Sequence, residues 1–428
     1  MKIEFKKNLI PFGSAALILF CIVAFQNCSS EFSARQLELA SQASMPSHEL
    51  NEEGSAANDA NEIRENQVPA PLIYFASGDL VDDCLDNSSY DACLFFKNPV
   101  AQNGGPISQE RMDEDSLVPL QKFGVVLNLQ GQRYLENDSV SVKNAFGYRA
   151  VTDQGSWKFD ATDGQHRLGQ VSAYYWVNAT ISEMKRRTGS FYAEGRHLSV
   201  VVDSQQTGWS SSENQIMFET NKNGLQMAFD AGTIVHLLGE ANIYYATNGN
   251  IELKDSDTHH LDCGPENGPI FQKACCHSET GCSRAISAGA SDYLTALMFP
   301  ESPTLAEYLM NDPSGLNMCG QSRDLRLASS LKVSDAFHAC DAQGAQGEVY
   351  TMGTIYASIW WEIRKSLVES EQRVFDRLYM RHLSMIDSED DFRTLLQKIE
   401  QLDCSEFACR FSPSFREEYR RRGMNSNS

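Results

Sequence analysis

The stretch DAGTIVHLLGEANIYYAT, residues 230–247, is the part of the chain around which the fold can be predicted. Asp230 can cap the start of a helix, because its carboxylate can accept hydrogen bonds from the first backbone N–H groups of that helix. Apolar residues then recur at helical spacing, namely Ile234, Leu238, Ala241 and Tyr245. The pattern predicts an amphipathic helix whose apolar face is buried.

His236 and Glu240 lie four positions apart in this stretch, so both project from the same side of the predicted helix. Two ligating side chains at this spacing can hold a metal ion from a single helix. On these two residues alone, a hydrogen-bonded core histidine and a solvated or capped acid are the simpler interpretation. The remainder of the chain bears on this choice.

The stretch resembles the zinc helix of thermolysin-like and fungalysin-like metallopeptidases, which carries the motif H-E-x-x-H. The first histidine of the motif falls on His236, the general-base glutamate on Leu237, and the second histidine on Glu240. The resemblance implies an α+β fold with two lobes, in which the cleft helix lies between a β-rich N-terminal lobe and a mainly helical C-terminal lobe. The resemblance also implies that catalysis has been lost, because Leu237 cannot accept a proton as the general-base glutamate does.

Residues 285–299 resemble the second zinc helix of these families. The ligand glutamate of that helix falls on Ala288, and Asp292 takes the place of the carboxylate that orients the first zinc histidine. A capping or salt-bridge role is the alternative for Asp292. The resemblance implies that Asp292 lies about 2.7–3.2 Å from the ring of His236, with Ala288 on the wall of the same cleft.

Residues 348–364 resemble the fungalysin-like signature D-x-H-x-x-G-x-I-x-A-x-x-L-W-x-x-R, and this is the closest match in the chain. The histidine that stabilises the tetrahedral intermediate falls on Tyr350, which is expected to face the same cleft. These families also carry an Asn-Ala pair on an edge strand that holds the substrate backbone, and residues 206–209 lack it. The expected relic positions, none of them an intact catalytic group, are His236, Leu237, Glu240, Ala288, Asp292 and Tyr350.

A peptidase zinc needs three protein ligands, a water and a carboxylate base. This chain supplies His236 outright and Glu240 at best as a second ligand, so no cofactor is expected. The alternative is a divergent metallopeptidase with a rebuilt zinc site around His236 and Glu240, completed by a third ligand such as His259 or His260.

The N-terminus has the pattern of an export signal. Three lysines, at positions 2, 6 and 7, precede an apolar run over residues 15–25 that is too short to span a bilayer comfortably. The run ends at Cys28, which resembles the lipidated cysteine of bacterial lipoproteins, although Asn27 departs from the small residue usual before it. We expect a signal peptide over residues 1–27 and a lipid anchor at Cys28, with an uncleaved anchor as the alternative.

Ten cysteines remain when Cys21 and Cys28 are set aside, and an even number outside the cytoplasm indicates disulfides. The local pairs expected are Cys84–Cys93, Cys319–Cys340 and Cys404–Cys409. The pairing of Cys263, Cys275, Cys276 and Cys282 stays open. His259, His260, Asp262 and His277 lie among these four, so a zinc knuckle is the alternative there.

The remaining composition divides the chain into a flexible tether over residues 28–69, a β-rich lobe over 70–247 that ends in the relic zinc helix, and a helical lobe over 248–428 with disulfide-rich loops. The formal net charge of −21 argues against a nucleic-acid partner. We therefore expect a lipoprotein of the cell envelope, with the outer membrane favoured by Ser29. It would act as a binding or structural protein, and its partners would be the membrane, through the anchor, and a protein or peptide of the envelope.

Overall fold

The computed structural model describes residues 92–95, 124–125, 134–151, 157–159, 163–220, 226–251, 281–300, 304–305, 323–332 and 346–424. All of these fall within one of the two compact units into which the chain divides. They combine several helices with a small mixed sheet, so the fold class is α+β, as predicted.

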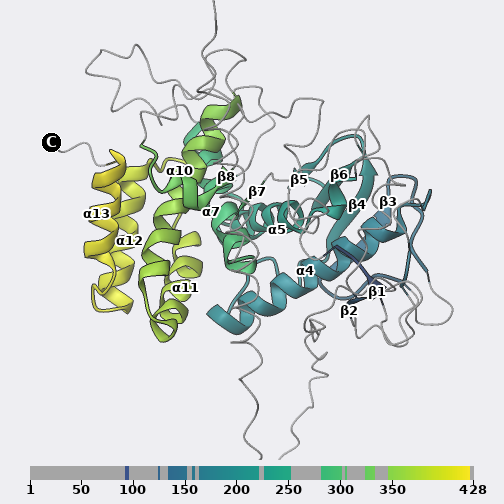
Figure 1. Ribbon diagram of the computed structural model, residues 1–428, viewed down its shortest axis with the longest axis horizontal. Helices are drawn as coiled ribbons and strands as arrows, with labels where there is room; N and C mark the ends of the chain where they lie inside the picture. Colours follow the sequence, from purple (N-terminus) through teal and green to yellow (C-terminus); the bar gives the residue numbers. More distant parts are fainter. Residues whose placement is uncertain are drawn as a thin grey trace, which may run out of the picture. The chain divides into compact units, whose positions relative to one another are not determined.

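The sheet has four strands in the order β3-β4-β6-β5 (Figure 1). Their bounds are Val140–Asn144 for β3, Leu198–Ser204 for β4, Gly208–Ser210 for β5 and Gln215–Glu219 for β6. The strands β3, β4 and β6 run parallel, whereas β5 is antiparallel to β6 and forms the edge. Two short strand pairs lie outside this sheet: β1 (Ala92–Cys93) with β2 (Gly124–Val125), and β7 (Thr304–Leu305) with β8 (Arg323–Asp324).

Helix α4 (Arg167–Thr188) connects the parallel strands β3 and β4, which cannot be joined by a tight turn. The helix ends at Gly189, whose φ of 84° is in the left-handed region that glycine adopts without steric cost. Lys185, Arg186 and Arg187 occupy the last turn, where positive charge is favoured by the helix dipole.

Helix α5 (Ala231–Ala246) follows the short 3-10 helix η3 (Met227–Phe229). Asp230 caps α5 as predicted, because its carboxylate accepts hydrogen bonds from the backbone N–H groups of Gly232 and Thr233 at 3.1 and 3.2 Å. The prediction that only one face of α5 is buried is wrong. Almost every residue of α5 is buried, because α4, β5 and the next long helix all pack against it.

Helix α7 (Gly281–Met298) contacts both α5 and α10 (Gln346–Ser366), as Figure 1 shows. Glycines permit the close approach on each side. A Cβ on Gly239 of α5 would lie 2.9 Å from the side chain of Ser291 on α7, and a Cβ on Gly353 of α10 would lie 2.7 Å from the carbonyl oxygen of Ala285. Because backbone atoms cannot move aside cheaply, the α7–α10 crossing depends on Gly353.

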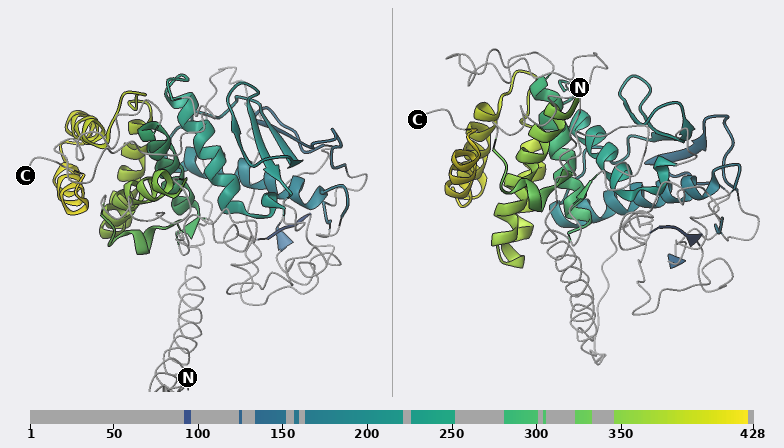
Figure 2. Two further views of the ribbon diagram at one scale, coloured as in Figure 1. Left: turned by 90° about the horizontal axis from the view of Figure 1, so that it is seen from above. Right: turned by 45° about the horizontal axis from the view of Figure 1, so that its top comes forward.

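The C-terminal region is helical, as predicted. Its helices are α11 (Glu369–Leu383), α12 (Phe392–Glu406) and α13 (Ser412–Arg422), preceded in sequence by the short α8 (Leu325–Ala328). The helices α12 and α13, yellow in Figure 2, lie side by side. Trp360 of α10 makes a tilted contact with the ring of Phe375 and an edge-to-face contact with that of Phe415, so this helical region has its own aromatic core. Among the helices of the described ranges, none combines the length and the apolar character that a membrane span requires.

Candidate functional site

His236 lies on α5 with only 6% of its surface exposed, and an acidic side chain approaches each of its ring nitrogens. Its Nδ1 is 3.0 Å from Oδ1 of Asp292 on α7, within the distance implied by the sequence resemblance. Its Nε2 is 3.3 Å from Oε1 of Glu240, one turn further along α5. Residues that are 56 positions apart in sequence, His236 and Asp292, therefore meet where the two helices cross.

The contact between His236 and Asp292 is electrostatic, since Nδ1 has no well-aligned hydrogen-bond acceptor. Burial and the nearby charge of Arg323 both lower the pKa of His236, but the two carboxylates outweigh them, and the net pKa is raised. The histidine therefore lies in an acidic environment, between Asp292 and Glu240.

Arg323 is the residue of this site that sequence reasoning missed. It lies in β8, its side chain is buried, and its guanidinium makes two hydrogen bonds to Asp292, one of them from Nε to Oδ2 at 2.9 Å. Its Nη2 also reaches the carbonyl oxygen of Ala288 at 3.4 Å. Asp292 therefore has both the orienting position implied by the resemblance and the salt bridge considered as its alternative.

Tyr350 of α10 joins the same group of residues through two arginines. The guanidinium carbon of Arg323 lies 4.9 Å from the centroid of its ring, a cation–π contact. Its hydroxyl accepts a hydrogen bond from Nη2 of Arg284 on α7 at 3.1 Å. Tyr350 therefore shares Arg323 with Asp292, and an arginine contacts both its ring and its hydroxyl.

Two of the relic positions are apolar parts of the core. Leu237 and Ala288 are both buried, with 6% and 1% of their surfaces exposed. Fully burying a leucine side chain is worth about 2 kcal/mol, so the residue at the position of the general base contributes to stability. Ala288 has only a methyl group, and its carbonyl oxygen is the part that contacts Arg323.

The residues around His236 do not fit a peptidase zinc. Nδ1 faces Asp292, so only Nε2 and Glu240 point to a common position, and a third ligand is needed. Within the described parts of the chain, no three His, Cys, Asp or Glu side chains are grouped in a way that could hold a metal ion. His259 and His260, considered as third ligands, lie outside the described residues.

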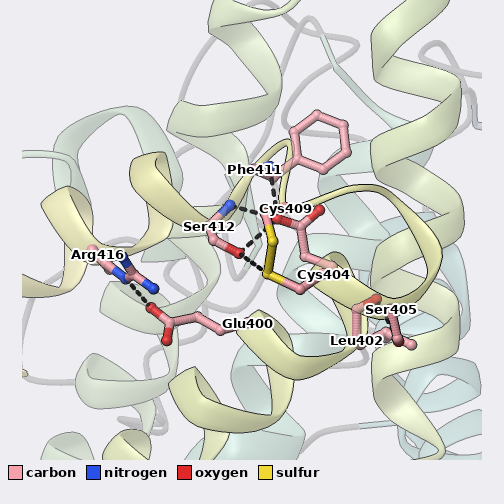
Figure 3. The surroundings of a disulfide bond; sticks show 9 residues. Glu400, Leu402, Cys404, Ser405, Cys409, Phe411, Ser412 and Arg416 are labelled. Carbon is pink, nitrogen blue, oxygen red and sulfur yellow. Dashed lines mark hydrogen bonds and ion pairs between the residues drawn. A yellow bond between two sulfur atoms is a disulfide. The ribbon is translucent and has the colours of Figure 1, made fainter.

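One of the predicted disulfides can be assessed. Cys404 and Cys409 are bonded to each other at the end of α12 (Figure 3). Only the backbone is described for Cys93 in β1 and Cys282 in α7, and the other cysteines singled out in the sequence lie outside the described residues: Cys28, Cys84, Cys263, Cys275, Cys276, Cys319 and Cys340. Residues 206–209, where the Asn-Ala pair of the resembling families is missing, run into the edge strand β5.

Comparison with known proteins adds no relative: no protein-family model matches the chain, and no curated protein has a similar sequence.

Proposed function

We propose that this chain is an exported lipoprotein whose domain descends from a two-lobed, thermolysin-like metallopeptidase and now acts as a binding or structural protein of the cell envelope. The observation that carries the proposal is the environment of His236. Its two ring nitrogens face Asp292 and Glu240, and Arg323 provides a second cation beside Asp292. Charges of the protein itself surround the histidine that would be the first metal ligand.

The order of the elements supports the descent. A crossover helix, a strand and an edge strand occur in the order α4, β4 and β5, the His236 helix α5 comes after β6 and η3, and the helix with Asp292 is α7. In a metallopeptidase this order places the histidine and its orienting carboxylate on neighbouring helices, and the 3.0 Å contact has that arrangement.

The absence of a base supports a role without catalysis. Hydrolysis by a metal-bound water needs a carboxylate to take the proton, and Leu237 occupies that position in the buried core. Loss of the base and loss of a ligand each remove orders of magnitude in rate. Incubating the purified mature domain with a broad peptide library should therefore give no cleavage that a chelator abolishes, and chelator-sensitive cleavage would contradict the proposal.

A second candidate function, a metallopeptidase with a rebuilt site, is supported by one observation. The 3.3 Å between Nε2 of His236 and Oε1 of Glu240 equals the separation of two ligands that share a tetrahedral zinc, about 3.3 Å for bonds near 2 Å. The peptide digest separates the two functions, because only the rebuilt enzyme loses activity on substitution of Glu240 by Gln.

Binding and purely structural roles can be separated by capture from envelope extracts. The mature domain and a Tyr350→Ala, Arg284→Ala variant are immobilised in parallel. A binding role predicts an envelope protein or peptide that the first retains and the variant releases. Equal retention by both would favour the structural role.

A further inference from the structure

Residues 323–332 include β8 and the short helix α8, and they make a contact at each end. At its start, Arg323 pairs with Asp292 in the candidate site. At its far end, the backbone carbonyl groups of residues 328–331 accept hydrogen bonds from two arginines of α13. The segment thus links the C-terminal helix to the surroundings of His236.

The arginine contacts at the far end are buried and specific. Arg422 is 1% exposed, and its Nη1 donates to the carbonyl oxygens of Ala328 and Leu331, the latter at 3.2 Å. Arg421 donates to the carbonyl oxygen of Ser329 at 2.9 Å. Burial, and secondarily the charge of Arg421, lowers the pKa of Arg422. The buried guanidinium is stabilised by these carbonyl acceptors and by Glu418, whose Oε2 lies 3.5 Å from Nε of Arg422.

The start of α13 is positioned by Asp403, which is fully buried at the end of α12. Its Oδ2 accepts hydrogen bonds from the backbone N–H groups of Phe411 and Ser412 at 2.8 and 2.6 Å, and from the hydroxyl of Ser412. The next residue along α12 is Cys404, which the disulfide joins to Cys409. The disulfide therefore bridges the turn between α12 and α13, directly beside the residue that binds the start of α13.

The backbone of this turn is unfavourable by itself. Ala408 and Cys409 have φ values of 59° and 55°, in the left-handed region that costs a non-glycine residue roughly 1 kcal/mol or more. The disulfide and a 3.1 Å hydrogen bond from the N–H of Cys409 to the carbonyl of Asp403 hold the turn in place. Both cysteines are exposed, so a reductant can reach the sulfur atoms.

We propose that the Cys404–Cys409 disulfide is a redox-sensitive lock on the candidate site. A dithiol reduces it by thiol–disulfide exchange: the dithiol supplies two electrons and two protons, becomes a disulfide, and leaves Cys404 and Cys409 as thiols. Without the bond, the left-handed turn relaxes and Asp403 loses its alignment with the start of α13. Arg422 then withdraws from residues 328–331, and Arg323 is no longer held against Asp292. This lock operates whether or not the site binds a metal.

The test uses the mature chain, residues 28–428, in an oxidised wild-type form and as a Cys404→Ser, Cys409→Ser variant. Because dithiothreitol would also reduce other cysteine pairs, the variant isolates this one. Hydrogen exchange followed by mass spectrometry should be about tenfold faster in residues 412–422 and also in residues 323–332 of the variant. The 15N signals of His236, assigned from a His236→Gln variant, should shift. An Arg420→Gln variant, which breaks only an exposed pair with Glu417, is the matched control and should change neither.

Faster exchange in residues 412–422, with unchanged exchange in 323–332 and unchanged His236 signals, would overturn the lock. Unchanged exchange in 412–422 would do the same. Loss of protection throughout α4 would show global unfolding and would equally contradict a local device. An oxidised Arg422→Met variant tests the last link separately: it should speed exchange in 323–332 and shift the His236 signals, and a folded variant that does neither is contrary to the proposal.

Discussion

Replacing Arg323 by Met tests whether the charges around His236 act as one group. The substitution keeps an unbranched side chain of similar length but removes the guanidinium that pairs with Asp292. The carboxylate of Asp292 is 1% exposed, so water cannot replace the lost partner. The imidazole of His236, whose pKa is raised, and the hydroxyl of Thr354, which donates to Oδ2 at 3.4 Å, remain beside it.

The expected loss of stability follows from that burial. Removing one partner of a buried ion pair costs about 3–5 kcal/mol, because the other charge is left uncompensated. His236 still supplies partial compensation, whereas the contact of Arg323 with the ring of Tyr350 is also lost, at about 0.5–2 kcal/mol. We expect Arg323→Met to lower the free energy of unfolding by about 3 kcal/mol.

Urea denaturation followed by tryptophan fluorescence measures this change, with Arg326→Met as the matched control. Arg326 lies three residues away and pairs with the buried Asp324, but its own side chain is 54% exposed. Solvent can therefore replace much of its charge, and we expect a smaller loss, about 1 kcal/mol. The double variant Arg323→Met, Asp292→Asn should recover about 2 kcal/mol of the loss, because no unpaired charge remains. A loss for Arg323→Met no larger than that for Arg326→Met would refute the reasoning.

Three further outcomes are expected. Burial, followed by the charge of Lys398, lowers the pKa of His382 to about 3, whereas the same histidine in the unfolded chain takes up a proton near pH 6.5. The free energy of unfolding should therefore fall as the pH drops below 6.5, by about 2 kcal/mol at pH 5. Denaturation of a His382→Gln variant at several pH values should show less of this dependence. The raised pKa of His236 affects stability in the opposite direction, because its stabilising contribution is present at low pH and is lost as the pH rises through that pKa. Gly353→Ala should destabilise the α7–α10 crossing by about 1–3 kcal/mol in thermal unfolding, while Gly164→Ala, which has open space around it, should be nearly neutral. Mass spectrometry of the protein from membranes should find a lipidated N-terminus at Cys28, and a processed sample that retains Met1 would contradict the anchor.

The helices and the central strand were predictable from the sequence because each carries a local signal. Asp230 gives a cap, and the helix it starts has apolar residues at helical spacing. The α5–α7 contact of His236 with Asp292 followed from a resemblance of motifs. The nearly complete burial of α5 was not predictable, since it depends on which elements pack around the helix.

Arg323 could not be found from the sequence. It lies in a loop-rich region with no periodic pattern, and a lone arginine there is usually solvated. Its role arises only because β8 brings it beside α7, 31 positions from Asp292. The hydrogen bonds of Arg422 to residues 328–331 could not be predicted either, because a run of arginines at the end of a helix such as α13 is typical of an exposed, charged helix terminus.

The central claim, that the site around His236 has exchanged a metal for the protein's own charges, is tested most directly by zinc stoichiometry. The purified mature chain and its His236→Ala variant are dialysed side by side against micromolar zinc, and bound metal is measured by elemental analysis. We expect the same zinc content in both proteins, with no zinc site that depends on His236. One zinc per chain in the parent that is lost in His236→Ala would contradict it.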